Sequence, residues 1–171
     1  MIIADATVLI ALSKMGRLEL LREVYGQVGI GTVVKREVLD QGKAISAPGV
    51  ERIEKALEQR WLRVVSLTAK EHRLMRRILD NSRLHEGEAE SLSLARQRGL
   101  MLIVDDKEAR GYAGTLGVAY LGTAGVLLEA YMRKHLSFRE LEEAVRDLSK
   151  VIWLSPVVVA EILKAAREEQ A

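Results

Sequence analysis

The sequence predicts an α/β protein of three layers, in which helices flank both faces of a central parallel sheet. Short apolar segments alternate along the chain with longer segments of helical periodicity, the pattern of a parallel sheet. Residues 101–104 are continuously apolar, as is typical of a strand buried on both faces. Acidic residues directly follow two of the apolar segments, at Asp5 and at Asp105–Asp106. In such sheets, sites form outside the carboxyl ends of the strands.

Five short apolar segments have the length and flanking residues of strands. The first stops at Asp5, the second lies between glycines, and the fourth follows Gly99. Strands are expected over residues 2–4, 28–30, 62–67, 101–104 and 118–121.

Helix start and stop signals divide the rest of the chain. Thr68 and Ser137 are each followed three residues later by a glutamate, which predicts a capping box at both positions. Thr32 is expected to cap the helix that contains Glu37. Residues 41–49, with glycine, serine and proline, are expected to form a loop. Helices are expected over residues 6–13, 18–24, 33–38, 50–59, 69–79, 85–98, 107–116, 123–133, 138–149 and from near 156 to the end.

Composition favours one globular domain spanning residues 1–171, with the helical segment from about 137 to 171 packed on the same core. The chain has 171 residues, of which 49% are hydrophobic and 29% charged, and a net charge of +2. Cysteine is absent, which excludes disulfides and thiolate chemistry. The apolar N-terminus lacks a basic segment and is interrupted by Asp5, so it is interpreted as a strand rather than a signal peptide. No segment has the ~20 apolar residues of a membrane span, so we expect a cytoplasmic protein without membrane contact.

Four acids occupy positions where strands end or helices begin. Asp5 alone is equally well explained as a helix N-cap, Glu37 as a surface residue and Glu88 as a first-turn acid. Taken together with Asp105 and Asp106, they are expected to converge at one edge of the sheet. Converging carboxylates repel one another and need a cation, and oxygen ligands of this kind suit Mg²⁺ or Mn²⁺. Such clusters usually serve metal-assisted phosphoryl transfer.

The order and spacing of these motifs resemble the PIN-domain nucleases, including the VapC-type toxins. The resemblance rests on five strings: DAT from Asp5, TVVKREVL around Glu37, GEAES around Glu88, LIVDDKEAR around Asp106, and YLGTAGVLLEA. GEAE and DDxxAR together are similar to one subgroup of that family. The resemblance implies a PIN-like fold and a Mg²⁺- or Mn²⁺-dependent endoribonuclease, with Asp5, Glu37, Glu88 and Asp106 as catalytic residues. Metal ligands would come from Asp5, Glu88, Asp105 and Asp106.

Two departures from the family pattern leave a second hypothesis open. Val104 stands two residues before Asp106, where the family commonly has serine or threonine, and Glu88 replaces the usual aspartate. The alternative is a non-catalytic PIN-like module that binds nucleic acid or a protein partner. A phosphatase of the haloacid-dehalogenase type is disfavoured, because it would need an aspartate where Thr7 stands.

Substrate contacts and partners follow from the same resemblance. The substrate would be RNA, single-stranded or structured, and candidate contacts are Thr7, Arg110 and Thr123, with Arg73 and Arg77 on a basic helical face. Arg110 is equally well explained as a structural partner of Asp106, Thr123 as a helix cap, and the basic face as a solvated surface. The resemblance also implies a homodimer and a possible antitoxin partner.

Trp61 and Trp153 adjoin apolar segments, so both are interpreted as packing residues rather than base-stacking residues.

Overall fold

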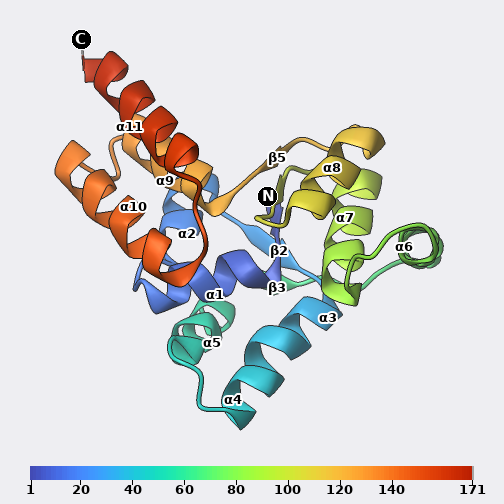
Figure 1. The fold of residues 1–171 in the computed structure, drawn as a ribbon. Helices are drawn as coiled ribbons and strands as arrows, with labels where there is room; N and C mark the ends of the chain where they lie inside the picture. Colours follow the sequence, from blue (N-terminus) through green and yellow to red (C-terminus); the bar gives the residue numbers. More distant parts are fainter. Residues whose placement is uncertain (171) are drawn as a thin grey trace.

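The expected α/β architecture is confirmed by a computed structural model, which describes residues 1–170 (Figure 1). Five strands form one sheet in the order β3-β2-β1-β4-β5, and every neighbouring pair is parallel. The strands are β1 (Ile2–Ala4), β2 (Val28–Ile30), β3 (Leu62–Val64), β4 (Leu102–Ile103) and β5 (Tyr120–Leu121).

Helices cover both faces of the sheet, because side chains along each strand alternate between two apolar clusters. Ile2 and Ala4 belong to the larger cluster, whereas Ile3 between them belongs to the smaller one. The larger cluster is covered by α1 (Ala6–Lys14), α2 (Leu20–Tyr25), α3 (Thr32–Lys35), the π-helix η1 (Arg36–Gln41), α5 (Val50–Glu58), α9 (Thr123–Met132), α10 (Phe138–Val151) and α11 (Pro156–Gln170). The smaller cluster is covered by α6 (Ala69–Asp80), α7 (Glu86–Arg98) and α8 (Lys107–Leu116).

The connectivity reverses direction at the first strand. From β1 the chain adds β2 and then β3 on one side, and afterwards places β4 and β5 on the other side. The carboxyl ends of β1 and β4 therefore flank a topological switch point, where the loops that leave the sheet diverge. Asp5 follows β1 and Asp105–Asp106 follow β4, so the fold brings these acids to the same place.

Most helix boundaries follow the expected signals. Thr68 and Ser137 both form capping boxes with the glutamate three residues on, and Gly99 and Gly117 end α7 and α8 in the left-handed conformation.

No helix within residues 1–170 is both long and apolar enough to cross a membrane.

Three expectations about local structure are wrong. Gly31, not Thr32, is the N-cap of α3. The expected loop at 41–49 is shorter, because η1 continues to Gln41 and α4 (Gly42–Ala44) follows it directly. The strands at 62–67, 101–104 and 118–121 are also shorter than expected, since paired backbone extends only over the residues that face a neighbouring strand.

The two tryptophans differ in environment. Trp61 is buried in the larger cluster, as expected, and its indole nitrogen donates to Gln59. Trp153 lies in the segment between α10 and α11 and is 84% exposed, so its interpretation as a packing residue is wrong. The apolar residues that flank it in sequence suggested burial, but only Ile152 and Leu154 turn toward the core.

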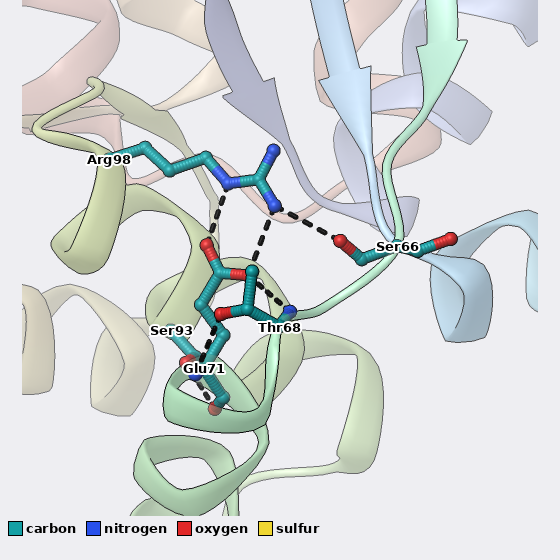
Figure 2. Close-up of polar contacts among 5 residues, drawn as sticks. All are labelled: Ser66, Thr68, Glu71, Ser93 and Arg98. Carbon is teal, nitrogen blue, oxygen red and sulfur yellow. Dashed lines mark hydrogen bonds and ion pairs between the residues drawn. The ribbon is translucent and has the colours of Figure 1, made fainter.

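An ion pair between the buried Glu71 and the partly exposed Arg98 fixes α6 against α7 (Figure 2). Arg98 at the end of α7 donates through Nε to Glu71 Oε1 at 2.6 Å and through Nη2 to Oε2 at 3.0 Å. The same nitrogen donates to the Ser66 carbonyl, and Ser93 donates its hydroxyl to the Glu71 carbonyl. These bonds hold α7, which carries one of the candidate acids, against α6 and the segment that leaves β3.

Candidate functional site

Asp5 forms the floor of the candidate site. Its backbone N–H donates to the Ile103 carbonyl at 3.0 Å, which ties the end of β1 to β4. The residue stands at the N-cap of α1, yet its side chain accepts no capping hydrogen bond, and it is only 3% exposed. Burial, together with smaller contributions from the nearby charges of Glu88 and Glu37, raises the pKa of this carboxyl to about 7.

Asp106 lies at the exposed rim. It caps α8, with Oδ1 accepting a hydrogen bond from the Ala109 N–H at 2.8 Å. Its neighbour Asp105 is fully engaged by Thr123, whose N–H donates to Oδ1 at 2.8 Å and whose hydroxyl donates to Oδ2 at 2.6 Å. This pair joins the end of β4 to the start of α9. Of the two adjacent acids, Asp106 is therefore the one that keeps a carboxylate oxygen available at the surface.

Glu88 enters from the first turn of α7. One of its oxygens accepts a hydrogen bond from the His85 backbone N–H at 2.9 Å, so the carboxylate lies beside the N-terminus of α7. Partial burial raises the pKa of Glu88, and the negative charge of Asp106 raises it further. The two acids therefore lie close enough to repel, although 18 positions separate them in the chain.

Glu37 approaches from η1, and a glycine on α7 makes room for it. A β-carbon at position 87 would lie 2.7 Å from Glu37 Oε2, so only glycine lets the carboxylate take this position. Burial raises the pKa of Glu37, with additional increases from the charges of Glu90 and Glu88. A π-helix at this point is itself notable, because such turns are frequent at functional sites.

Glu90 is a structural acid that the sequence interpretation missed. It is 1% exposed and accepts hydrogen bonds from the Thr32 hydroxyl at 3.0 Å, the Val33 N–H at 2.9 Å and the Val34 N–H at 3.2 Å. It thereby satisfies the free amides at the start of α3 from a different helix. The signal in the sequence was that the last glutamate of the GEAE string is followed by the segment SLSLA, which contains no charged residue.

The start of α7 thus organises half of the site. Glu86 pairs with Arg36 at 3.2 Å, Gly87 admits Glu37, Glu88 joins the cluster, and Glu90 holds α3 in front of η1. Each position of the short string EGEAE has a separate task, apart from the buried Ala89.

The four candidate catalytic acids form one electrostatic unit. The charges of Glu88 and Glu37 raise the pKa of Asp5, and the charge of Glu88 raises the pKa of Glu37. The charge of Asp106 in turn raises the pKa of Glu88. Within residues 1–170 none of the four has a lysine, arginine or histidine as an ion-pair partner. In that same range, no three acidic or histidine side chains are close enough to hold one cation as they stand. The donor set of unpaired carboxylate oxygens nevertheless fits a divalent cation such as Mg²⁺ or Mn²⁺.

The candidate substrate-binding residues are distributed unevenly. Thr7 is exposed at the start of α1, whereas Thr123 is fully buried and bonded to Asp105. Arg110 is half-buried beside Asp105 and Gly122. Arg73 and Arg77 are exposed on α6, which lies on the outer side of α7 (Figure 1).

A groove of about 520 Å³ begins at Asp106 and runs between the start of α8 and the last helix. Lys107 and Arg110 from α8 line this groove, and so does Trp153 from the segment between α10 and α11. The lining residues are Asp105, Asp106, Lys107, Arg110, Leu121, Gly122, Ala124, Gly125, Ile152, Trp153, Leu154, Ser155, Val158, Glu161 and Ile162.

The model of a PIN-domain family matches residues 1–168, and the chain therefore belongs to the PIN-domain family. No curated protein sequence and no solved structure gives a match. PIN domains are generally nucleases, a class of hydrolases, and typically use divalent metals. The coarse assignment as a nuclease-type protein thus agrees with acids gathered at the carboxyl ends of β1 and β4.

Proposed function

We propose that this protein is a Mg²⁺- or Mn²⁺-dependent endoribonuclease that hydrolyses RNA phosphodiester bonds. The observation that carries the proposal is the convergence of Asp5, Glu37, Glu88 and Asp106 from four different elements. These acids raise one another's proton affinity, and within residues 1–170 none of them forms an ion pair with a cationic side chain. An arrangement that is costly for the apoprotein is the arrangement expected of residues selected to bind a cation.

Each acid has a distinct part in this reaction. Asp5, Glu88 and Asp106 would hold the cation, with Asp5 as the rigid buried ligand and Asp106 as the exposed one. Asp105 would act indirectly, because its two oxygens already bind Thr123. A divalent cation supplies charge neutralisation at the phosphate and makes a water more acidic.

Glu37 is suited to receive the proton of the attacking water. Burial raises the pKa of Glu37 above its ordinary value, which makes this carboxylate a stronger base. As the water oxygen bonds to phosphorus, the bond to the leaving ribose oxygen breaks, and that oxygen takes a proton from solvent. Glu37 would then lose its proton to bulk water before the next turnover.

Purified protein should cleave RNA in Mn²⁺ or Mg²⁺, and EDTA should abolish cleavage. Asp5→Asn and Asp106→Asn should each lose cleavage while circular dichroism shows an unchanged fold. Glu86→Gln is a matched control, because this exposed acid sits in the same turn of α7 but pairs with Arg36 outside the cluster. Calorimetry that detects no divalent-ion binding at all would refute the catalytic proposal.

We further propose a toxin role with an antitoxin partner and a homodimeric state, both on the strength of the family alone. Induced expression in a bacterial host should arrest growth, and Asp106→Asn should restore it. Light scattering of the purified chain gives the oligomeric state directly. Arrest that persists in the Asp106→Asn variant would exclude nuclease activity as its cause.

The alternative is a PIN module that binds nucleic acid or a protein without cutting. It is favoured by one observation: no three candidate ligands within the described chain stand close enough to share a cation. Tight RNA binding without cleavage across Mg²⁺, Mn²⁺ and Co²⁺ would support this alternative over the ribonuclease.

A further inference from the structure

We propose that Trp153 is a stacking platform for an unpaired nucleobase of the substrate, which makes single-stranded RNA the preferred ligand of the groove beside Asp106. The inference rests on the proposed function for the chemical class of its ligand. It adds the substrate conformation and a binding residue that lies outside the acid cluster.

The position of Trp153 is the first observation. At 84% exposure it is the most exposed large apolar side chain among residues 1–170, and the indole makes no hydrogen bond or aromatic contact within that range. The segment that carries it is anchored on both sides, since Ile152 and Leu154 pack against the larger cluster. The ring is therefore presented by a fixed backbone rather than by a loose end.

The groove itself is the second observation. It joins Trp153 to Asp106 within one depression of about 520 Å³, a volume in the range of small-ligand sites. Its lining combines apolar residues such as Leu154 and Val158 with the basic residues Lys107 and Arg110, which follow Asp106 in the chain. A nucleotide likewise combines a flat apolar base with a phosphate.

The basic lining residues favour RNA over an apolar protein segment as the occupant. Such a segment would fill the apolar part of the groove equally well, but it would bring no anion for Lys107 and Arg110, which share the lining with the acids Asp105, Asp106 and Glu161. A phosphate bound by Lys107 or Arg110 would leave a neighbouring base of the same strand free to reach Trp153, which lines the same groove. Aromatic stacking requires a base that has left its duplex, so the strand must be unpaired at that point.

Binding is measured best without turnover, by fluorescence anisotropy of a labelled single-stranded oligoribonucleotide in EDTA. Trp153→Ala should weaken binding by about tenfold, the lower part of the range for base–aromatic stacking. Trp153→Phe should retain most of the affinity, because it keeps a ring. Met132→Ala is the control, since Met132 is exposed but lies outside the groove. A duplex of the same sequence should bind equally to wild type and Trp153→Ala.

Tryptophan emission gives a second readout. The chain has two tryptophans, and Trp61 is only 6% exposed, so quenching by added RNA reports on Trp153. Quenching should be strong in the wild type and absent in Trp153→Phe even though that variant still binds.

The outcomes separate this inference from the proposed function. If Trp153→Ala binds and cleaves RNA as the wild type does, the stacking role is refuted while the ribonuclease stands. If binding depends on Trp153 but no metal supports cleavage, the ribonuclease is refuted while the stacking role stands. If RNA affinity is unchanged and light scattering shows that Trp153→Ala alters the oligomeric state, the surface is a protein interface and the inference is overturned.

Discussion

The Glu37 carboxylate occupies the space where a side chain at position 87 would begin. A β-carbon on Gly87 would lie 2.7 Å from Oε2 and 3.0 Å from Oε1 of Glu37. Gly87 is inside a helix, where glycine is ordinarily unfavourable by about 1 kcal/mol relative to alanine. The glycine therefore serves the position of the acid rather than the stability of the helix.

Gly87→Ala should uncouple activity from stability. The added methyl group displaces the Glu37 carboxylate, so RNA cleavage should fall by about tenfold to hundredfold, the usual cost of misplacing a reacting group by about 1 Å. The free energy of unfolding should stay constant or rise, because alanine favours the helix. Gly111→Ala in α8 is the matched control, since nothing lies within 4 Å of its added β-carbon. Equal cleavage by both variants would show that the position of Glu37 does not matter.

Asp5→Asn should stabilise the protein at alkaline pH. The folded state holds the Asp5 pKa near 7, against 3.8 as the ordinary value, so the folded chain binds the extra proton between these limits. Stability contributed by this residue is therefore greatest below pH 4 and is lost as pH rises toward 7, by up to about 4 kcal/mol. The melting temperature of Asp5→Asn should exceed that of the wild type at pH 8, and the gap should narrow at pH 5. Mn²⁺ should also narrow the difference between the two melting temperatures at pH 8, because only the wild type has the buried negative charge that the cation offsets.

Loss of the Glu71–Arg98 pair should destabilise the protein and change its acid sensitivity. The Arg98 guanidinium holds the pKa of Glu71 at about 2, so this stabilisation is complete above the ordinary value of 4.5 and is lost as pH falls from there toward 2. We expect a contribution of about 2 kcal/mol, less than the whole shift implies because Arg98 is 31% exposed and water screens the pair.

Urea unfolding at pH 6 and pH 3 measures this contribution. Arg98→Ala should lose about 3 kcal/mol or more at pH 6, because it leaves Glu71 buried without its cation. Arg139→Ala, which breaks an exposed pair with Glu143, should change stability by less than about 1 kcal/mol. A flat pH profile for the difference between wild type and Arg98→Ala would contradict the pairing.

Glu90→Ala should reduce cleavage although Glu90 is not among the proposed ligands. Alanine has no oxygen to accept from the Val33 and Val34 N–H groups, so both backbone amides would lose their acceptor. We expect a loss of about 1–3 kcal/mol in stability and a weaker hold on η1, which carries Glu37. Hydrogen exchange at the start of α3 should accelerate in this variant. Protection that equals the wild type would show that Glu90 does not anchor the helix.

Local signals in the sequence were sufficient for most of the fold. Capping residues and helix-ending glycines mark their elements without reference to the rest of the chain, which is why Thr68, Ser137, Gly99 and Gly117 were interpreted correctly. The family motifs then identified the acids of the candidate site, which are Asp5, Glu37, Glu88 and Asp106.

The errors arose where contacts between distant segments decide the outcome. Thr32 looked like a cap because a nearby side chain normally fills that role, but Glu90 on another helix satisfies those amides instead. The sequence also showed no sign that Asp105 would accept two hydrogen bonds from Thr123, 18 positions later. Trp153 looked buried because an apolar neighbourhood in sequence does not say which of its side chains faces the core.

The hydrogen bond from the Asp5 N–H to the Ile103 carbonyl links the end of β1 to β4, so the four acids fall into two groups by the elements that position them. Asp5 and Asp106 follow adjacent strands of one sheet. Glu88 lies in the first turn of α7, and Glu37 lies against Gly87 in the same turn. A small tilt of α7 would move Glu88 directly and Glu37 through its contact with Gly87, so both acids would change their distance from Asp5 and Asp106. The affinity of the site for a cation would then depend on the angle between α7 and the sheet as well as on the four individual side chains.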